Sequence, residues 1–169
     1  MSTPLAERMR PKNLDEFVGQ KQLVAQGAVL RNVIESGQIP SFILWGPPGV
    51  GKTTLASIIA NTLKRPYYAL SAINSGVKDV RETIAKAESN RFFNSPNPIL
   101  FIDEIHRFSK SQQDSLLGAV EKGTVTLIGA TTENPSFEVI SALLSRCQVY
   151  VLKPLDKEDL IRLIDRAII

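Results

Sequence analysis

The sequence is poor in the residues that most often build covalent or transition-metal chemistry. Its 169 residues include one cysteine, Cys147, and one histidine, His106. A single cysteine excludes an internal disulfide and is typical of a reducing compartment. We interpret Cys147 as a small core residue and not as a nucleophile, because no base is evident beside it. A lone histidine without other ligand-like residues does not predict a metal site.

The sequence also lacks long apolar segments. No apolar run approaches the length that crosses a bilayer, and residues 1–17 are charged where a signal peptide has an apolar stretch. We therefore expect a cytoplasmic protein without a membrane partner. Hydrophobic residues make up 43% of the chain, enough for one domain with a proper core. The net charge of +3 is compatible with an anionic partner.

Apolar runs alternate with amphipathic segments along the chain. Strands are expected at 42–45, 67–70, 99–102, 125–128 and 148–152. Helices are expected at 21–36, 52–63, 77–89, 111–121, 136–144 and 157–169. This alternation predicts an α/β fold with a parallel five-stranded sheet and helices on both faces. In such sheets, ligands bind at the carboxyl ends of the strands.

The stretch FILWGPPGVGKTTL carries the most specific motif in the chain. Gly46, Gly51, Lys52 and Thr53 match the phosphate-binding pattern G-x-x-x-x-G-K-[ST] and lie between an expected strand and an expected helix. Backbone N–H groups of this loop and the start of the helix can bind ATP phosphates. Lys52 would reach the β and γ phosphates, and the Thr53 hydroxyl can ligate Mg²⁺. The other predicted nucleotide contacts of this stretch are Pro47, Pro48, Gly49, Val50 and Thr54.

Acidic side chains follow the apolar run 99–102. Asp103 is placed to hold Mg²⁺, directly or through water, and Glu104 to polarise an attacking water. The acid at the second position favours real hydrolysis over nucleotide binding alone; the alternative is a solvated acidic pair. His106 follows closely, and we interpret it as a structural residue or as a relay between nucleotide and helix.

Two further polar positions are candidates for the same site. Thr132 follows the strand 125–128 and is placed to bind the γ-phosphate or to orient the water, with Thr131 and Asn134 as competitors. The alternative is an ordinary polar turn. Arg146 is far from the phosphate loop in sequence and is a candidate arginine finger, in cis or in trans; the alternative is a surface arginine.

The N-terminal residues 1–20 precede the first strand and are expected to form an irregular strap over the core. Val18 is placed to pack on the adenine ring, although the strap has a purely structural alternative. Pro154 marks a joint before the last expected helix. We therefore expect a nucleotide-binding core at 1–153 and a separate helical segment at 154–169.

At this point the motifs GPPGVGKTT, FIDEIH, GATTENPSFEV and SRC, in that order, resemble an AAA+ ATPase of the clamp-loader and Holliday-junction-motor branch. The closer resemblance is to the replication-associated recombination protein A family, with its Werner-helicase-interacting relatives. It rests on PLAERMRPKNLDEFVGQ, on DEIHRFSKSQQDSLLGAVEKGTVTLIGATTENPSFEV and on SALLSRCQVYVLKPL, and covers nearly the whole chain.

This resemblance implies roles that spacing does not show. Thr132 would be the sensor-1 residue, and Arg146 would act on ATP held by a neighbouring subunit. Val18 and Gly19 would line the adenine pocket. Asp103 and Glu104 would be the Walker B pair, and Ser71 would correspond to the polar residue that restrains Glu104 until DNA arrives.

The resemblance also implies a homo-oligomeric ring that acts on DNA at stalled replication forks. Its partners would be single-stranded or forked DNA, single-strand-binding protein and other fork proteins, in a nucleoid-associated location. Candidate contacts to DNA phosphates are Lys78, Arg81, Arg107 and Lys110. The alternative is that these four residues form a solvated helix face.

Relatives continue into a helical lid that carries a sensor-2 arginine, whereas this chain stops at Ile169, inside the first lid helix. We therefore expect a fragment that is monomeric and only weakly active. The rival functions are a clamp-loader or Holliday-junction-motor subunit, an AAA+ protein remodeller and a nucleotide-gated binding module. Phe92 and Phe93 keep the remodeller open, because such proteins carry an aromatic pore loop.

Overall fold

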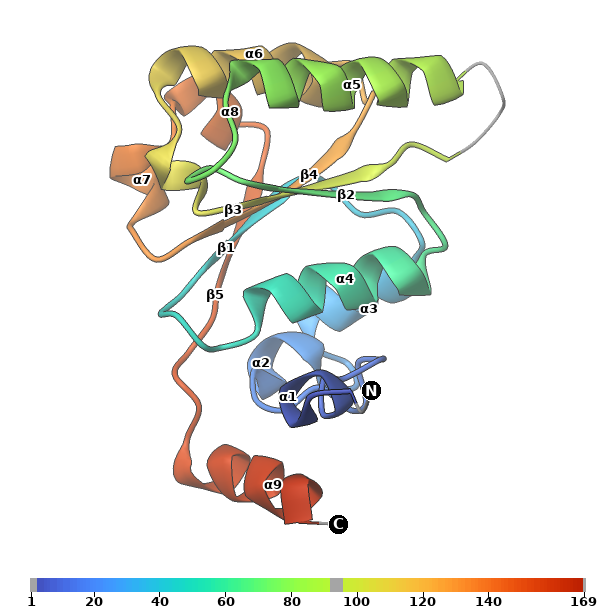
Figure 1. Cartoon of the computed structure of the whole chain (residues 1–169), viewed down its shortest axis with the longest axis vertical. Coiled ribbons are helices and arrows are strands. Elements are labelled where there is room, and N and C mark those ends of the chain that lie inside the picture. The colour runs from blue at the N-terminus through green and yellow to red at the C-terminus, as the bar shows by residue number, and fades with distance from the viewer. Residues whose placement is uncertain (1–2, 92–95, 169) are drawn as a thin grey trace.

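A parallel sheet of five strands forms the centre of the molecule (Figure 1). The computed structural model describes residues 3–91 and 96–168. The strands are β1 (Phe42–Trp45), β2 (Tyr67–Ser71), β3 (Ile99–Asp103), β4 (Thr126–Thr131) and β5 (Gln148–Val151). They lie in the order β2-β3-β4-β1-β5, and every pair is parallel. The predicted five-stranded parallel sheet is therefore confirmed.

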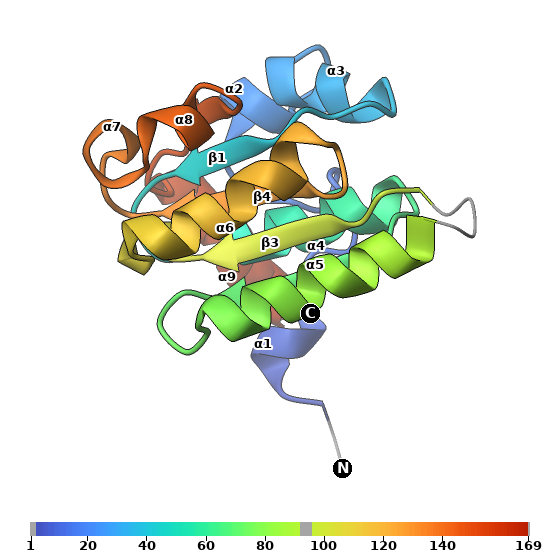
Figure 2. The ribbon, with the colours of Figure 1, turned by 90° about the horizontal axis from the view of Figure 1, so that it is seen from above.

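Helices cover both faces of this sheet, which gives the predicted three layers (Figures 1 and 2). One side carries α1 (Leu5–Arg8), α2 (Lys21–Val24), α3 (Val29–Glu35) and α4 (Lys52–Thr62). The other side carries α5 (Val77–Arg91), α6 (Lys110–Glu121) and α8 (Ser141–Leu144). The remaining short elements are the 3-10 turn η1 (Ile105–Arg107) and α7 (Pro135–Glu138), and α9 (Lys157–Ile168) ends the described chain.

The apolar runs of β1 and β3 are buried on both faces of the sheet, which explains why they do not alternate with polar residues. Phe42 and Phe101 pack towards α3 and α4, whereas Ile43 and Leu100 pack towards α5 and α6. All four side chains are almost completely buried. Side-chain packing thus fixes the strands and, with them, the polar groups at the carboxyl ends.

Two expected helices are each interrupted. The segment 21–36 forms α2 and α3, because Ala25 and Ala28 are extended and Gly27 has a positive φ of 80°. The segment 136–144 forms α7 and α8, with Val139 and Ile140 extended between them. Strand β4 runs further than expected, to Thr131. Phe92 and Phe93, together with residues 94 and 95 of the expected polar break, lie outside the described residues.

The N-terminal strap is attached to the far end of the core by one buried side chain. The Gln20 amide donates to the Lys153 carbonyl oxygen at 2.6 Å and accepts from the Lys153 N–H at 2.8 Å. Next to it, the Cα of Gly19 faces Leu155, where a Cβ would lie only 2.7 Å from Leu155 Cδ2. The strap therefore contacts residues 153–155, which connect β5 to α9.

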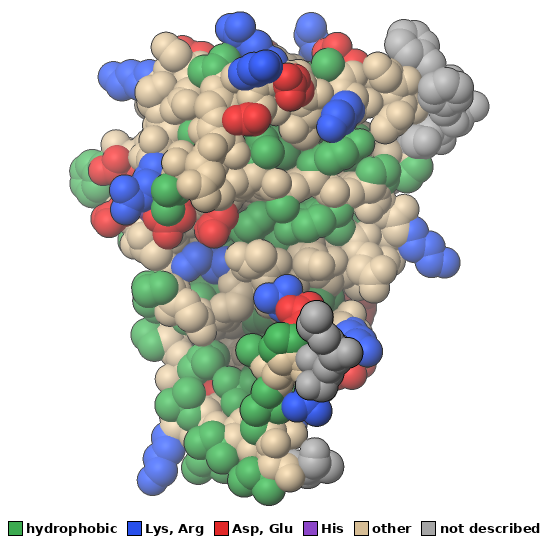
Figure 3. Space-filling view, in the orientation of Figure 1, with side chains coloured by type: hydrophobic (Ala, Val, Ile, Leu, Met, Phe, Trp, Pro, Cys, Tyr) green, Lys and Arg blue, Asp and Glu red, His purple; other side chains and the backbone are tan. Residues whose placement is uncertain are grey.

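Helix α9 leaves an apolar face uncovered within the described chain. Asp156 and Asp159 cap its first turn reciprocally. The Asp159 N–H donates to Asp156 Oδ1 at 2.8 Å, and the Asp156 N–H donates to Asp159 Oδ2 at 3.1 Å. Figure 3 shows hydrophobic side chains gathered over this end of the molecule. The exposed apolar residues of α9 are Leu160, Ile161, Ile164 and Ile168. Among the described residues, no helix combines the length and hydrophobicity required to cross a membrane.

We expect Gln20→Ala to lower the free energy of unfolding by about 1–3 kcal/mol, because both hydrogen bonds to Lys153 are lost. Urea unfolding followed by circular dichroism measures this change. Gln26→Ala removes the same amide from an exposed position on the surface and serves as the control, with a change of at most about 0.5 kcal/mol. Equal effects of the two substitutions would contradict a stabilising role of the hydrogen bonds between Gln20 and Lys153.

Candidate functional site

The loop between β1 and α4 presents free backbone donors at the carboxyl edge of the sheet. Gly51 caps α4 with a φ of 94°, and no side chain of the described residues bonds to the first N–H groups of the helix. By contrast, Ser109 and Gln112 form a complete capping box at the start of α6. The uncapped N-terminus of α4 therefore fits an anion, which would accept these N–H groups and meet the positive end of the helix dipole.

Glycine is required in this loop for space as well as for conformation. A Cβ on Gly51 would lie 2.9 Å from the ring of Phe17. A Cβ on Gly46 would lie 2.8 Å from the Leu152 carbonyl oxygen, because β1 and β5 are adjacent there. The loop backbone therefore lies between Phe17 of the strap and Leu152, the residue after β5, without room for a Cβ on Gly46 or Gly51.

Lys52 is the buried cation of the site. Its ammonium donates to the carbonyl oxygens of Gly46 at 2.6 Å and Pro47 at 2.9 Å. Burial lowers the pKa of Lys52, and the nearby carboxylates of Asp103 and Glu104 act in the opposite direction. A phosphate group beside this ammonium would favour its charged form.

The predicted polar clusters meet around one cavity of about 290 Å³. Thr53 comes from α4, Asp103 and Glu104 follow β3, and Thr132 follows β4. The complete lining is Pro48, Gly49, Gly51, Lys52, Thr53, Thr54, Asp103, Glu104 and Thr132. A hydroxyl and a carboxylate beside a phosphate loop match the donor set of Mg²⁺, which takes few protein ligands and completes its shell with phosphate and water oxygens.

A second, mainly apolar hollow adjoins the cavity and shares Gly49, Gly51 and Thr54 with it. Its other lining residues are Pro11, Phe17, Val18, Val50, Leu155 and Leu163. Such a hollow beside a phosphate site fits a planar base. Val18 lines this hollow, and its contact with adenine stays a prediction, whereas Gly19 faces Leu155 and is not in the lining. Phe17, Leu155 and Leu163 were missed, because only the fold brings the strap and α9 together.

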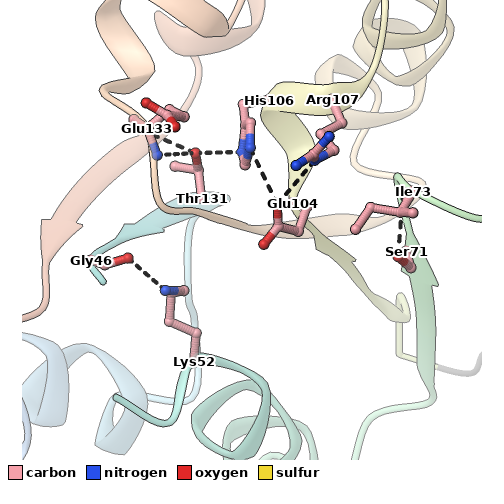
Figure 4. A network of polar contacts seen from close by, with 9 residues as sticks. All are labelled: Gly46, Lys52, Ser71, Ile73, Glu104, His106, Arg107, Thr131 and Glu133. Carbon is pink, nitrogen blue, oxygen red and sulfur yellow. Dashed lines mark hydrogen bonds and ion pairs between the residues drawn. The ribbon is translucent and has the colours of Figure 1, made fainter. Parts of the chain in front are cut away.

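Glu104 stands on a sharp turn that aims its side chain. It adopts a left-handed φ of 58° as the first residue of the turn into η1, a conformation that is uncommon outside glycine. Figure 4 shows its carboxylate between two η1 side chains. Glu104 Oε2 lies 3.3 Å from His106 Nε2 and 3.4 Å from Arg107 Nε. His106 Nδ1 lies 2.9 Å from Thr131 Oγ1, so β3 and β4 are linked through this ring.

Residues 42–155 match the family model of ATPases associated with various cellular activities (AAA). The chain belongs to the AAA family. It is 54% identical to replication-associated recombination protein A of Escherichia coli K12 over 164 residues, which are 97% of this chain and 36% of the relative. It is 53% identical to ATPase WRNIP1 of Dictyostelium discoideum over 165 residues, 98% of this chain and 19% of the relative.

Solved structures support the same fold. The Thermotoga maritima RuvB Holliday junction branch migration motor superposes on this AAA domain with a TM-score of 0.76 and 32% identity. The match covers 94% of this chain and 53% of that one. The chain therefore spans about a third of the Escherichia coli relative and about half of the RuvB structure.

Ser71 and Arg146 of the AAA domain lie outside the lining of the phosphate cavity. The Ser71 hydroxyl accepts from the Ile73 N–H at 3.3 Å (Figure 4), whereas Glu104 bonds to His106 and Arg107. Arg146 follows α8, and its Nε lies 3.1 Å from Glu121 Oε1 at the end of α6. In this structure Arg146 therefore has an acidic partner within its own chain.

The four basic candidates for DNA contact are exposed and gather near the starts of α5 and α6. Lys78 lies 3.9 Å from Glu82, and Arg107 pairs with Glu104. The side chains of Arg81 and Lys110 make no hydrogen bond or ion pair within the described chain. These two side chains are consequently the freest to meet a ligand.

We expect Lys52→Ala to weaken binding of a fluorescent ATP analogue at least tenfold, because the cation beside the phosphates is removed. A fluorescence titration measures the dissociation constant, and circular dichroism checks that the domain remains folded. Lys122→Ala removes an exposed lysine after α6 and is the control. Unchanged affinity in Lys52→Ala would rule out the assigned phosphate site.

Proposed function

We propose that this AAA domain is the ATP-hydrolysing core of a DNA-dependent ATPase that acts in replication-fork maintenance, recombination and repair. The observation that carries the proposal is the single cavity in which the phosphate loop, Asp103, Glu104 and Thr132 meet. The replication and recombination role rests on the relatives named above. Because the chain spans about a third of the Escherichia coli relative, the activity of the whole protein is part of the proposal.

The side chains divide the work of hydrolysis between them. The N-terminus of α4 and Lys52 hold the phosphates, and the apolar hollow around Phe17 and Val18 holds the base. Mg²⁺ bound by Thr53 and Asp103 would neutralise charge on the phosphate oxygens. Glu104 orients the attacking water and accepts its proton, while Thr132 contacts the γ-phosphate.

Arg146 is proposed to complete the site of a neighbouring subunit. It does not line the phosphate cavity of its own chain, and it is held at Glu121 on α6. A guanidinium in this position serves phosphoryl transfer when a second copy presents its nucleotide to it. Hydrolysis then requires a homo-oligomer, and an isolated domain would be weakly active.

DNA is proposed to bind at the starts of α5 and α6. Lys110 is the first residue of α6, whose first turn contains no acidic residue. A cation at a helix N-terminus opposes the helix dipole at a cost of about 0.3–1 kcal/mol. A phosphate of the DNA backbone bound by Lys110 and Arg81 would offset this cost without reading sequence.

The likeness to RuvB favours a second candidate, a Holliday-junction-motor or clamp-loader subunit. The same cavity and the same Arg146 would serve those machines, so the distinction lies in the DNA and protein partners. A protein remodeller and a nucleotide-gated binding module remain rivals. Strong stimulation of ATP turnover by single-stranded or forked DNA separates the leading proposal from the protein remodeller and the binding module.

We expect Glu104→Gln to lower ATP turnover of the full gene product at least about a hundredfold while ATP still binds, because the proton acceptor is lost. Phosphate release measures turnover, and nucleotide titration measures binding. Glu88→Gln alters an exposed carboxylate on α5 and is the control. Turnover at the wild-type level in Glu104→Gln would remove Glu104 from the mechanism.

Subunit mixing tests whether Arg146 acts in trans. Lys52→Ala and Arg146→Ala proteins should each be inactive, and a mixture should recover turnover. In the mixture, an intact phosphate loop from one subunit meets an intact Arg146 from the other. Absence of recovery, with mixed oligomers demonstrated by cross-linking, would contradict action in trans.

We expect the double variant Arg81→Gln/Lys110→Gln to weaken binding to single-stranded DNA by about tenfold and to lower the salt dependence of log K by about 0.7 per lost contact. Fluorescence anisotropy at several salt concentrations measures both. The control Arg8→Gln/Lys122→Gln removes the same net charge from exposed positions elsewhere. Equal losses in the two double variants would indicate a general charge effect and not a defined DNA site.

A further inference from the structure

His106 is the buried connection between Glu104 and the end of β4. Its side chain is 10% exposed and does not line the phosphate cavity. Nε2 faces Glu104 Oε2 at 3.3 Å, and Nδ1 faces Thr131 Oγ1 at 2.9 Å (Figure 4). Both ring nitrogens are therefore engaged, one by the water-polarising carboxylate and one by the residue that precedes Thr132.

The position of the ring follows from the packing of η1 on β4. Gly129 has no side chain, and Ile105 occupies the space, with its Cδ1 3.2 Å from where a Cβ would stand. Ile105 is completely buried. The turn at Glu104 and the burial of Ile105 together place His106 beside Thr131, so the backbone and the packing of Ile105 determine where the His106 ring lies.

Hydrogen-bond chemistry determines which nitrogen carries a proton. If Nε2 were unprotonated, its lone pair would face a carboxylate oxygen and repel it. A proton on Nε2 is therefore the arrangement that fits its 3.3 Å approach to Glu104 Oε2. The Thr131 hydroxyl accepts from the Glu133 N–H at 2.9 Å, and its single proton can go either to the Glu133 carbonyl oxygen at 3.1 Å or to His106 Nδ1 at 2.9 Å. A ring with a proton on Nε2 fits both contacts when the Thr131 hydroxyl donates to Nδ1 and not to the Glu133 carbonyl oxygen.

The second partner of Glu104 is less constrained. Arg107 also contacts Oε2, but its side chain is 60% exposed, and exposed ion pairs contribute little. No described residue bonds to the other oxygen, Oε1. In Figure 4 this oxygen points away from His106, towards the side on which Lys52 lies.

We propose that His106 is a positioning residue for hydrolysis: it holds Glu104 Oε2 so that Oε1 faces the attacking water, and it ties this carboxylate to the strand end that carries Thr132. The proposal rests on the proposed ATPase function. A displacement of Thr132 on contact with the γ-phosphate would be transmitted through Thr131 and His106 to the carboxylate. His106 itself does not touch the nucleotide.

Three substitutions at His106 in the full gene product separate the two contacts of the ring. The amide of glutamine reaches about as far as Nε2, whereas that of asparagine reaches about as far as Nδ1. We expect His106→Ala and His106→Asn to lower kcat about 10–100-fold, and His106→Gln to restore it to within about threefold of wild type. The KM for ATP and the nucleotide affinity should stay unchanged. Loss in all three variants, or increased KM with normal kcat, would overturn the proposal.

A double substitution tests whether His106 acts through Glu104. In the Glu104→Gln background, His106→Ala should cause no further loss of kcat, because residues that act as a unit are not additive. A full additional 10–100-fold loss would show a role independent of Glu104 and would contradict the proposal.

The histidine tautomer is measurable without turnover. His106 is the only histidine of the chain, so ¹⁵N-labelled protein gives one pair of imidazole signals. We expect a proton on Nε2 in the wild type and a changed tautomer population in Glu104→Gln. A proton on Nδ1 alone would overturn the assignment. If the wild-type protein failed to hydrolyse ATP, the proposed function would fall, while this spectrum would still decide the His106 contact.

Discussion

Among residues 3–91 and 96–168, no side chain accepts from the N–H groups at the start of α4, and the neighbouring loop keeps these donors accessible. Gly51 begins the helix in a conformation that leaves these donors open, and Gly46 lets β5 pass close to the loop. Lys52 meanwhile donates to the loop carbonyls, so it adds a cation at the same place. An anion is the one class of ligand that satisfies the donors, the dipole and the ammonium together.

The sheet explains why this anion site is also a catalytic one. Its buried strands are all parallel and end at the same edge, so the residues that follow β3 and β4 must lie beside the phosphate loop. Asp103, Glu104 and Thr132 reach one cavity for this reason. The side-chain contact that holds Glu104 comes from η1 and links the carboxylate to β4 through His106.

The base hollow connects this edge to the ends of the chain. Phe17 and Val18 come from the strap, and Leu155 and Leu163 come from the other side of the joint at Pro154. Gln20 bonds to Lys153 just beside them. A nucleotide that fills the hollow would therefore touch both segments.

Much of this architecture could be predicted from the sequence. The continuous apolar runs of β1 and β3 predicted buried parallel strands, and the phosphate loop with its acidic partners predicted the contents of the cavity. The breaks at Gly27 and at Val139 were missed, because a helical spacing of apolar residues does not reveal one extended turn within it. The contacts of Phe17, of Gln20 with Lys153 and of His106 with Thr131 were not predicted, because each depends on a partner distant in the chain.

The most direct test is a crystal structure of the chain with a non-hydrolysable ATP analogue and Mg²⁺. We expect phosphates over the N-terminus of α4, Mg²⁺ between Thr53 and Asp103, and the base against Val18 and Phe17. We also expect the Lys52 ammonium to leave the loop carbonyls for the phosphates. A nucleotide bound elsewhere, or phosphates that leave the first N–H groups of α4 without an acceptor, would contradict the assigned site.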